Sequence, residues 1–261
     1  MTISRREFLQ AGLTTGASVA LGASATLPML GLIAPPADYP VPPEGLTLYQ
    51  SAIRFNVFGL GLKTMTPEGY DSVIDKIVPA AQKIAKEGAN AISIFGTSLT
   101  FYRGAAFNQK LIDDVRKTTG LKTTSMSTAV VEGLKTMGAR RIAVATAYND
   151  EVNRRMTTFL GEHGFDVLVL KGLGLETIGD PGKVSQAELQ QFSIGVFKSA
   201  SKADALLVSC GGLRTLELLA PLENECQVPV VSSTPHALWA GMRSLGLHVK
   251  SPSYGRLLAK G

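Results

Sequence analysis

The stretch from Asp204 to Leu213, which reads Asp-Ala-Leu-Leu-Val-Ser-Cys-Gly-Gly-Leu, indicates the class of fold. Its apolar run at 205–208 is short and rich in branched side chains, which is typical of a buried strand in a parallel sheet. Apolar residues at helical spacing follow at 213–225. Open α/β sheets bind ligands outside the carboxyl ends of their strands, where glycines and helix starts leave backbone N–H groups free. Cys210 is therefore either the thiol of such a site or a buried free cysteine that ends a strand.

Strands and helices alternate along the rest of the chain, which predicts an α/β fold with parallel sheets. Segment 88–99 weakly echoes segment 202–213, and this echo favours two pseudo-symmetric αβα halves whose loops meet at one cleft. The first half is expected at 29–127 and the second at 128–233, and the segment from about 234 to 261 is a candidate to return to the first half. We expect strands at 29–34, 54–60, 91–95, 122–125, 141–145, 166–170, 205–208 and 228–232. Helices are expected at 46–53, 67–87, 127–138, 150–163, 185–200, 215–225 and 235–245, with a further helix that follows a loop at 99–104 and ends near 118.

Composition excludes several classes of protein. The 261 residues are 45% hydrophobic and 18% charged, as in a globular protein, and the net charge is +5. The basic residues are scattered without interleaved aromatics, so nucleic-acid binding is not expected. No Cys/His cluster has metal-ligand spacing, and no metal or cofactor is expected. A disulfide between Cys210 and Cys226 stays open, although the helix between them would separate the two thiols.

The first residues resemble a twin-arginine export signal. Ser4-Arg5-Arg6-Glu7-Phe8-Leu9 precedes a mildly apolar stretch at 13–25, which is too short and too polar for a stable membrane span. The small residues at 23–25 suit a cleavage site. We therefore expect residues 1–25 to be a signal peptide, the twin-arginine export machinery to be a partner, and the mature protein to be periplasmic. The alternative is an ordinary amphipathic start.

The predicted cleft brings residues 96–98 opposite residues 210–212, with Tyr148 at a third strand end. Its groups are one thiol, three hydroxyls and several backbone N–H groups, which suit a carboxylate because they donate hydrogen bonds to both oxygens. Hydrolysis fits poorly, because a nucleophile needs a base partner. A thiol beside a helix start is expected to have a lowered pKa and to transfer protons. These residues predict proton transfer at a carbon next to a carboxylate.

Matching segments cover nearly the whole chain after about residue 30. They include Gly-Thr-Ser-Leu at 96–99 and Ser-Cys-Gly-Gly-Leu at 209–213, with further matches at 59–62, 66–71, 101–108, 126–130, 145–148, 229–233 and 254–257. With these motifs the chain resembles the arylmalonate decarboxylases of the aspartate/glutamate racemase superfamily. The resemblance implies a racemase-like fold in which two pseudo-symmetric α/β domains enclose one site that works without a cofactor.

The resemblance also implies a reaction. Racemases and maleate isomerases of this superfamily use one cysteine from each half, whereas this chain has Gly96 and Cys210 at those positions. A single thiol favours decarboxylation of an α-aryl or α-alkenyl malonate through an enediolate, followed by protonation on one face by Cys210. The family's dioxyanion hole corresponds to Thr97, Ser98, Tyr148 and the backbone at Cys210 and Gly211.

The substrate pocket implied by the resemblance is mostly apolar, and it would surround the carboxylate that leaves as carbon dioxide. It corresponds to Pro35, Pro36, Leu62, Met65, Tyr70, Leu99, Ile178 and Gly212. Met65, Pro181 and His236 depart from the family's pattern, so the shape of the pocket and the physiological substrate stay open.

Two alternatives remain at this point. One is a racemase or cis-trans isomerase of a small diacid or amino acid, against which Gly96 argues because the second thiol is absent. The other is a non-catalytic periplasmic protein that binds carboxylates. In each case the partner is a small-molecule carboxylate, and a monomer is expected.

Overall fold

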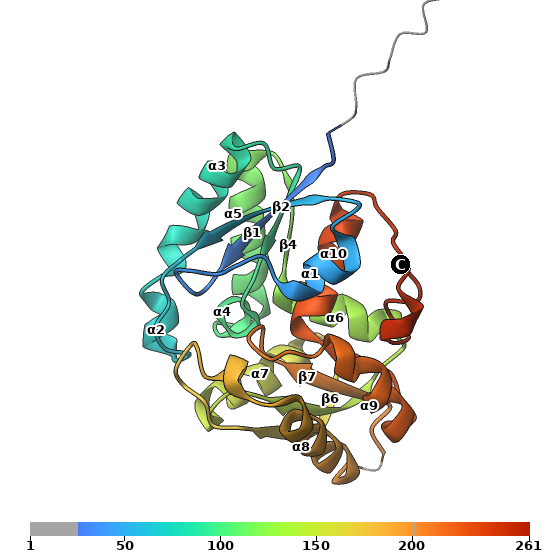
Figure 1. The fold of residues 1–261 in the computed structure, drawn as a ribbon. Coiled ribbons are helices and arrows are strands. Elements are labelled where there is room, and N and C mark those ends of the chain that lie inside the picture. Colours follow the sequence, from blue (N-terminus) through green and yellow to red (C-terminus); the bar gives the residue numbers. More distant parts are fainter. Residues whose placement is uncertain (1–25, 201) are drawn as a thin grey trace, which may run out of the picture.

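The computed structural model describes residues 26–200 and 202–261, so the expected export signal at 1–25 lies outside the described residues. The described chain forms two four-stranded parallel sheets flanked by helices (Figure 1). The predicted α/β fold with parallel sheets is confirmed. The first sheet has the order β2-β1-β3-β4 and the second has the order β6-β5-β7-β8. The strands are β1 (Met29–Ala34), β2 (Arg54–Gly59), β3 (Ala91–Ile94), β4 (Lys122–Ser125), β5 (Arg141–Thr146), β6 (Asp166–Gly172), β7 (Ala205–Ser209) and β8 (Val230–Ser232).

Ten α-helices of the described chain connect and cover these strands. They are α1 (Pro43–Tyr49), α2 (Pro67–Asp71), α3 (Ile77–Lys86), α4 (Thr97–Phe101), α5 (Ala105–Thr119), α6 (Met126–Thr136), α7 (Asp150–Glu162), α8 (Gln186–Lys198), α9 (Leu219–Cys226) and α10 (Ser233–Ser244). Short 3₁₀ turns lie at Ile74–Lys76, Pro181–Lys183, Leu216–Leu218 and Pro252–Tyr254. None of the helices described is long and apolar enough to cross a membrane.

The two sheets repeat one topology. In each, the second strand of the chain lies at one edge and the first and third strands lie side by side in the centre, when strands are counted within each half. The strand order reverses between those central strands, and open α/β sheets bind ligands at such a point. β3 and β7, the two strands of the internal echo, occupy equivalent places. The carboxyl ends of β1, β3, β5 and β7 are therefore where a shared site is expected.

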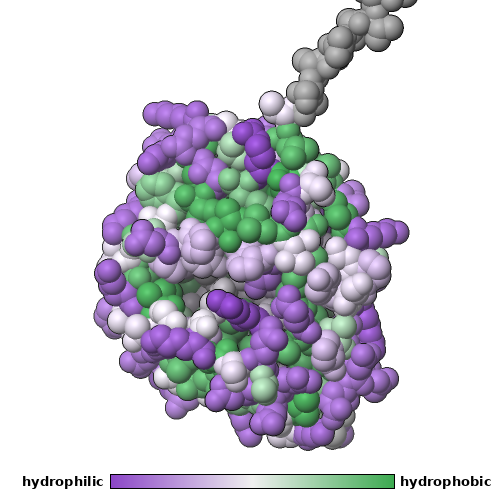
Figure 2. Space-filling model, in the orientation of Figure 1, coloured by the Kyte–Doolittle hydropathy of each residue, from purple (hydrophilic) through white to green (hydrophobic). Residues whose placement is uncertain are grey.

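Helix α10 links the two halves. It follows β8 of the second sheet, but it packs on α6 and lies against β3 and β4 of the first sheet. Ten of its twelve residues are buried, which is why the segment reads as apolar on every side. The last residues instead reach α9, where the Arg256 N–H donates to the carboxylate of Glu223. The apolar residues of edge strand β2 remain partly exposed, and hydrophobic side chains gather over this part of the first sheet (Figure 2).

Prolines divide two of the expected helices. The predicted helix at 67–87 is three pieces: α2, a 3₁₀ turn and α3. Pro79 is the third residue of α3, and a proline lacks the N–H and clashes with the carbonyl four residues earlier, so it fits only in a first turn. Pro221 occupies the same position in α9. The helix expected at 215–225 is therefore a 3₁₀ turn followed by α9, which begins only at Leu219 and so does not start beside Cys210.

Candidate active site

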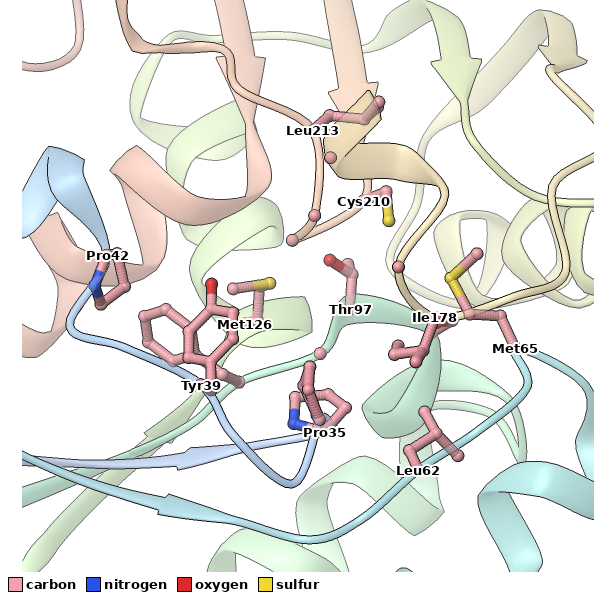
Figure 3. Close-up of a pocket in the computed structure, with 18 of the residues that line it drawn as sticks. Pro35, Tyr39, Pro42, Leu62, Met65, Thr97, Met126, Ile178, Cys210 and Leu213 are labelled. Carbon is pink, nitrogen blue, oxygen red and sulfur yellow. The ribbon is translucent and has the colours of Figure 1, made fainter. Parts of the chain in front are cut away.

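A cavity of about 350 Å³ opens at the carboxyl ends of the central strands and takes residues from both halves. Ten of the predicted site residues line it: Pro35, Pro36, Leu62, Met65, Thr97, Ser98, Ile178, Cys210, Gly211 and Gly212. The other three, Tyr70, Leu99 and Tyr148, are buried outside its lining. Figure 3 shows the Cys210 and Thr97 side chains in its middle.

Thr97 and Ser98 reach the cavity because the chain turns sharply at the end of β3. Gly96 makes this turn with a φ of 94°, a backbone conformation that residues other than glycine rarely adopt. Helix α4 starts at once, and the N–H groups of its first turn have no intrahelical acceptor. The Thr97 carbonyl accepts a 2.8 Å hydrogen bond from Ser127, which holds the turn from behind. The start of α4 thus presents two hydroxyls and free backbone donors to the cavity.

Cys210 directly follows β7 and directs its sulfur into the cavity (Figure 3). Its N–H donates to the Ser233 hydroxyl at 3.1 Å, so of the two backbone groups expected at an anion site only the Gly211 N–H remains a candidate donor. The Leu213 N–H donates to the Cys210 carbonyl and closes a turn. Both Cys210 and Cys226 are free cysteines, which excludes the disulfide left open by the sequence.

The pKa of the Cys210 thiol is shifted in the direction opposite to the one expected from the sequence. Burial raises its pKa to about 11, although the Gly212 N–H and the Tyr148 hydroxyl favour the thiolate. The expected lowering of this pKa is wrong, because no helix begins at the thiol and the side chain is only 5% exposed. Cys210 therefore carries its proton at neutral pH.

Tyr148 and Tyr70 stand behind the cavity wall. The Tyr148 hydroxyl lies 3.4 Å from the Ser209 hydroxyl and close to Cys210 and Thr97, and burial raises its pKa well above the ordinary value. The Tyr70 hydroxyl is buried near Ser98 and has no hydrogen-bond partner among the described residues. Both phenols remain neutral hydrogen-bond donors that adjoin the lining hydroxyls.

One side of the cavity is apolar. Leu62, Met65 and Ile178 lie there together in Figure 3. Two backbone hydrogen bonds join the loops that carry them: the Met65 N–H donates to Glu176 at 2.6 Å, and the Ile178 N–H donates to Lys63 at 3.0 Å. Since one loop comes from each half, these bonds also close the cleft at this side.

A large part of the lining was not predicted from the sequence. The loop between β1 and α1 contributes Tyr39, the first turn of α1 contributes Glu44, and α6 contributes Met126. Ser233 was also missed: its hydroxyl lies 2.7 Å from that of Thr97 and joins it to Cys210. Two features of the sequence could have identified Ser233 as a site residue: it directly follows a strand, and it lies inside the motif at 229–233 that matched the family. Besides Gly96, which belonged to the predicted cleft, the additional lining residues are Asp38, Tyr39, Pro40, Pro42, Pro43, Glu44, Phe95, Met126, Gly179, Gly182, Leu213 and Arg214.

His236 has a structural role, because it stabilises the start of α10. The Ser232 N–H donates to its Nδ1 at 2.8 Å at the start of α10, and burial lowers its pKa to about 4. It is therefore neutral at physiological pH. Across 26–200 and 202–261, no group of three or more His, Cys, Asp or Glu side chains is arranged to hold a metal ion.

Known proteins resemble this chain over nearly all of its described length. The family model for arylmalonate decarboxylase matches residues 30–258. The chain is 44% identical over 234 residues to arylmalonate decarboxylase from Bordetella bronchiseptica, which covers 89% of this chain and 97% of that protein. It also resembles a crystal structure of a liganded arylmalonate decarboxylase with a glycine-to-cysteine and a cysteine-to-serine substitution, with a TM-score of 0.86, 44% identity, and coverage of 88% of this chain and 98% of that one.

A more distant likeness extends to a maleate cis-trans isomerase from Nocardia farcinica that carries a covalently bound succinylcysteine intermediate. Its TM-score is 0.81 at 22% identity, and it covers 90% of this chain and 99% of that one, so it shows a common fold. The family model and the 44% identical relative are more specific, and they show that the chain belongs to the arylmalonate decarboxylase family, whose members are carboxy-lyases.

Proposed function

We propose that this protein decarboxylates disubstituted malonates with an α-aryl or α-alkenyl substituent, without a cofactor, and protonates the resulting enediolate on one face. The observation that carries the proposal is the pairing of one protonated thiol, Cys210, with the hydroxyls of Thr97 and Ser98 in one cavity. Family membership supports the same reaction.

In the first step, one carboxylate of the malonate lies against Leu62, Met65 and Ile178. An apolar surface stabilises neutral carbon dioxide better than it stabilises the charged carboxylate. It therefore favours breaking of the carbon–carbon bond. The electron pair of that bond stays on the substrate as an enediolate, which an aryl or vinyl group delocalises further.

In the second step, hydrogen bonds hold the enediolate. The donors are the hydroxyls of Thr97 and Ser98, with Tyr148 behind them, and the Gly211 N–H. One well-placed donor of this kind contributes about 2.7–4 kcal/mol to the transition state.

In the third step, the Cys210 S–H donates its proton to the carbanionic carbon. The product monocarboxylate and a Cys210 thiolate result, and water returns a proton to the thiolate. A raised pKa suits this role, because the resting thiol is loaded with the proton that it must deliver.

A two-base racemase is disfavoured by the opposite position. A Cβ built on Gly96 would lie 2.5 Å from Cγ of Pro35, and the φ of this glycine is positive, so a second thiol has no place there without a shift of the loop. Proton delivery from one side yields one enantiomer.

The test is to incubate the protein with methyl(phenyl)malonate in deuterium oxide without metal or cofactor. Release of carbon dioxide, one deuterated enantiomer, and loss of turnover in Cys210→Ala are expected. Deuterium exchange into a small diacid or amino acid without carbon dioxide release would instead indicate the isomerase or racemase. Carboxylate binding with neither reaction would indicate a binding protein.

We further propose that residues 1–25 direct the protein to the periplasm by the twin-arginine route. The support is the pair Arg5-Arg6 before Phe8-Leu9 and the small residues at 23–25. Replacement of both arginines by lysine should leave the full-length protein inside the cell, whereas replacement of Lys260 by arginine, a matched control, should not. Periplasmic appearance of the double variant would contradict the proposal.

A further inference from the structure

The cavity has a second side that the reaction above does not use. Tyr39, Pro42 and Met126 lie on one side of Thr97 and Cys210, and the apolar group of Leu62, Met65 and Ile178 lies on the other (Figure 3). We call the first set, together with Glu44, the outer side. A substrate carbon placed between Cys210 and Thr97 would direct one substituent into each side.

Tyr39 supplies both a ring and a hydroxyl to the outer side. It stands in the loop between β1 and α1, and it is partly buried. Its hydroxyl lies beside that of Thr234, and burial, with a smaller effect from the charge of Glu44, raises the pKa of the phenol. Tyr39 thus remains a neutral hydrogen-bond donor in the lining of the cavity.

Glu44 supplies a carboxyl group to the same side. It is only 8% exposed, although it lines the cavity, and burial raises its pKa. Among the ion pairs found in the described chain, none includes Glu44. Burial raises this pKa more than the Glu44 N–H and the charge of Arg214 lower it, so a hydroxyl donor from a ligand would further stabilise the ionised carboxyl.

Resting on the proposed function, we propose that Tyr39 and Glu44 are specificity-determining residues that select a malonate whose aryl substituent carries a phenolic hydroxyl. The aryl ring packs against Tyr39 and Met126, and its hydroxyl donates to the Glu44 carboxylate and accepts from Tyr39.

The surrounding residues disfavour other substituents. Pro40, Pro42 and Pro43 make the approach apolar, so the body of the substituent has to be apolar as well. Arg214 is exposed at the cavity and disfavours a cationic end, whereas Asp38 and Glu44 disfavour an anionic one. A neutral hydrogen-bonding group on an aromatic ring satisfies all of these conditions.

The experiment compares methyl(phenyl)malonate with methyl(para-hydroxyphenyl)malonate in wild type, Tyr39→Phe and Glu44→Gln. The measured quantity is the ratio of kcat/KM for the hydroxylated substrate to that for the plain one. Because the intrinsic reactivity of each substrate is the same with every variant, a change in this ratio reports the outer side alone. The ratio should fall at least about tenfold in each variant, which corresponds to about 1.4 kcal/mol.

Glu217→Gln is the matched control, since Glu217 is an exposed carboxylate close to Glu44 that does not line the cavity. Its ratio should equal that of wild type. A ratio that stays within twofold of wild type in both Tyr39→Phe and Glu44→Gln would overturn the proposal.

Failure of the proposed function is separable from failure of this inference. If neither malonate releases carbon dioxide, the proposed reaction is wrong, and calorimetry with 2-(para-hydroxyphenyl)propanoate and 2-phenylpropanoate tests the selectivity directly. Tighter binding of the hydroxylated acid to wild type, lost in Glu44→Gln, supports the inference. Equal affinity of wild type for the two acids contradicts it.

Discussion

Thr97 and Ser233 are 136 positions apart in the chain, yet their hydroxyls are hydrogen-bonded at 2.7 Å where α4 and α10 begin. The Ser233 hydroxyl also accepts a hydrogen bond from the Cys210 N–H. One side chain at the start of α10 therefore fixes the end of β7, which carries the thiol, relative to the turn that carries Thr97. This arrangement makes Ser233 a positioning residue for the proposed reaction.

Replacement Ser233→Ala should lower kcat about ten- to a hundredfold with a smaller change in KM. The Cys210 N–H and the Thr97 hydroxyl would lose a buried partner, which costs about 1–3 kcal/mol in unfolding free energy. Steady-state kinetics and urea unfolding measure the two effects. Ser244→Ala, on the last turn of the same helix, is the control and should retain kcat. A Ser233→Ala enzyme with the kcat of wild type would refute the positioning role.

Gly96→Ala should destabilise the fold by about 1–3 kcal/mol, because its φ is 94° and a Cβ would meet the ring of Pro35. Gly161 offers the contrast: it lies inside α7 with nothing within 4 Å of a built Cβ, so Gly161→Ala should stabilise by about 0.5–1 kcal/mol. Urea unfolding of both variants gives the comparison. Equal free energies of unfolding for Gly96→Ala and wild type would show that the turn tolerates a side chain.

The raised pKa of Cys210 predicts two pH effects. The rate of alkylation by iodoacetamide at Cys210, followed by peptide mass spectrometry, should still be rising at about pH 10, because the thiolate forms only near pH 11. A midpoint at or below the ordinary cysteine value near 8.5 would contradict it.

The second effect concerns stability. The folded pKa lies above that of the unfolded chain, so the thiol's contribution is fully present below pH 9 and is lost as pH rises toward 11. The unfolding free energy of wild type should therefore fall more steeply over that window than that of Cys210→Ser, by up to about 2–3 kcal/mol. Parallel pH profiles of the two proteins would be the opposite result.

Ile178→Thr should lower kcat about tenfold while KM changes less. A hydroxyl at this position would draw water to the carboxylate that leaves, and it would weaken the preference of the apolar side for carbon dioxide. Leu175→Thr, in the same loop but outside the cavity lining, is the control and should keep its kcat. An Ile178→Thr enzyme as fast as wild type would argue against a role for apolar surroundings.

The strands were predictable to within a residue or two at most ends, because buried parallel strands are short apolar runs between turn residues. Helices were less predictable. Pro79 and Pro221 each move a helix start. The helix expected at 127–138 begins instead at Met126 with Ser125 as its cap, and Ser127 is a buried residue whose hydroxyl donates to the Thr97 carbonyl. Periodicity reports which face is apolar, but it does not report where a proline forces the first turn.

The sequence by itself determined the parallel α/β class and the positions of Thr97, Ser98 and Cys210 at strand ends, since these follow from local patterns of apolar, small and polar residues. Only the tertiary structure decided that Ser233 joins two of them and that Tyr39 and Glu44 enter the same cavity, because these residues come from distant segments. It also decided the protonation of Cys210. The pKa of a thiol depends on how completely the surrounding chain removes it from water, and burial is a property of the whole fold.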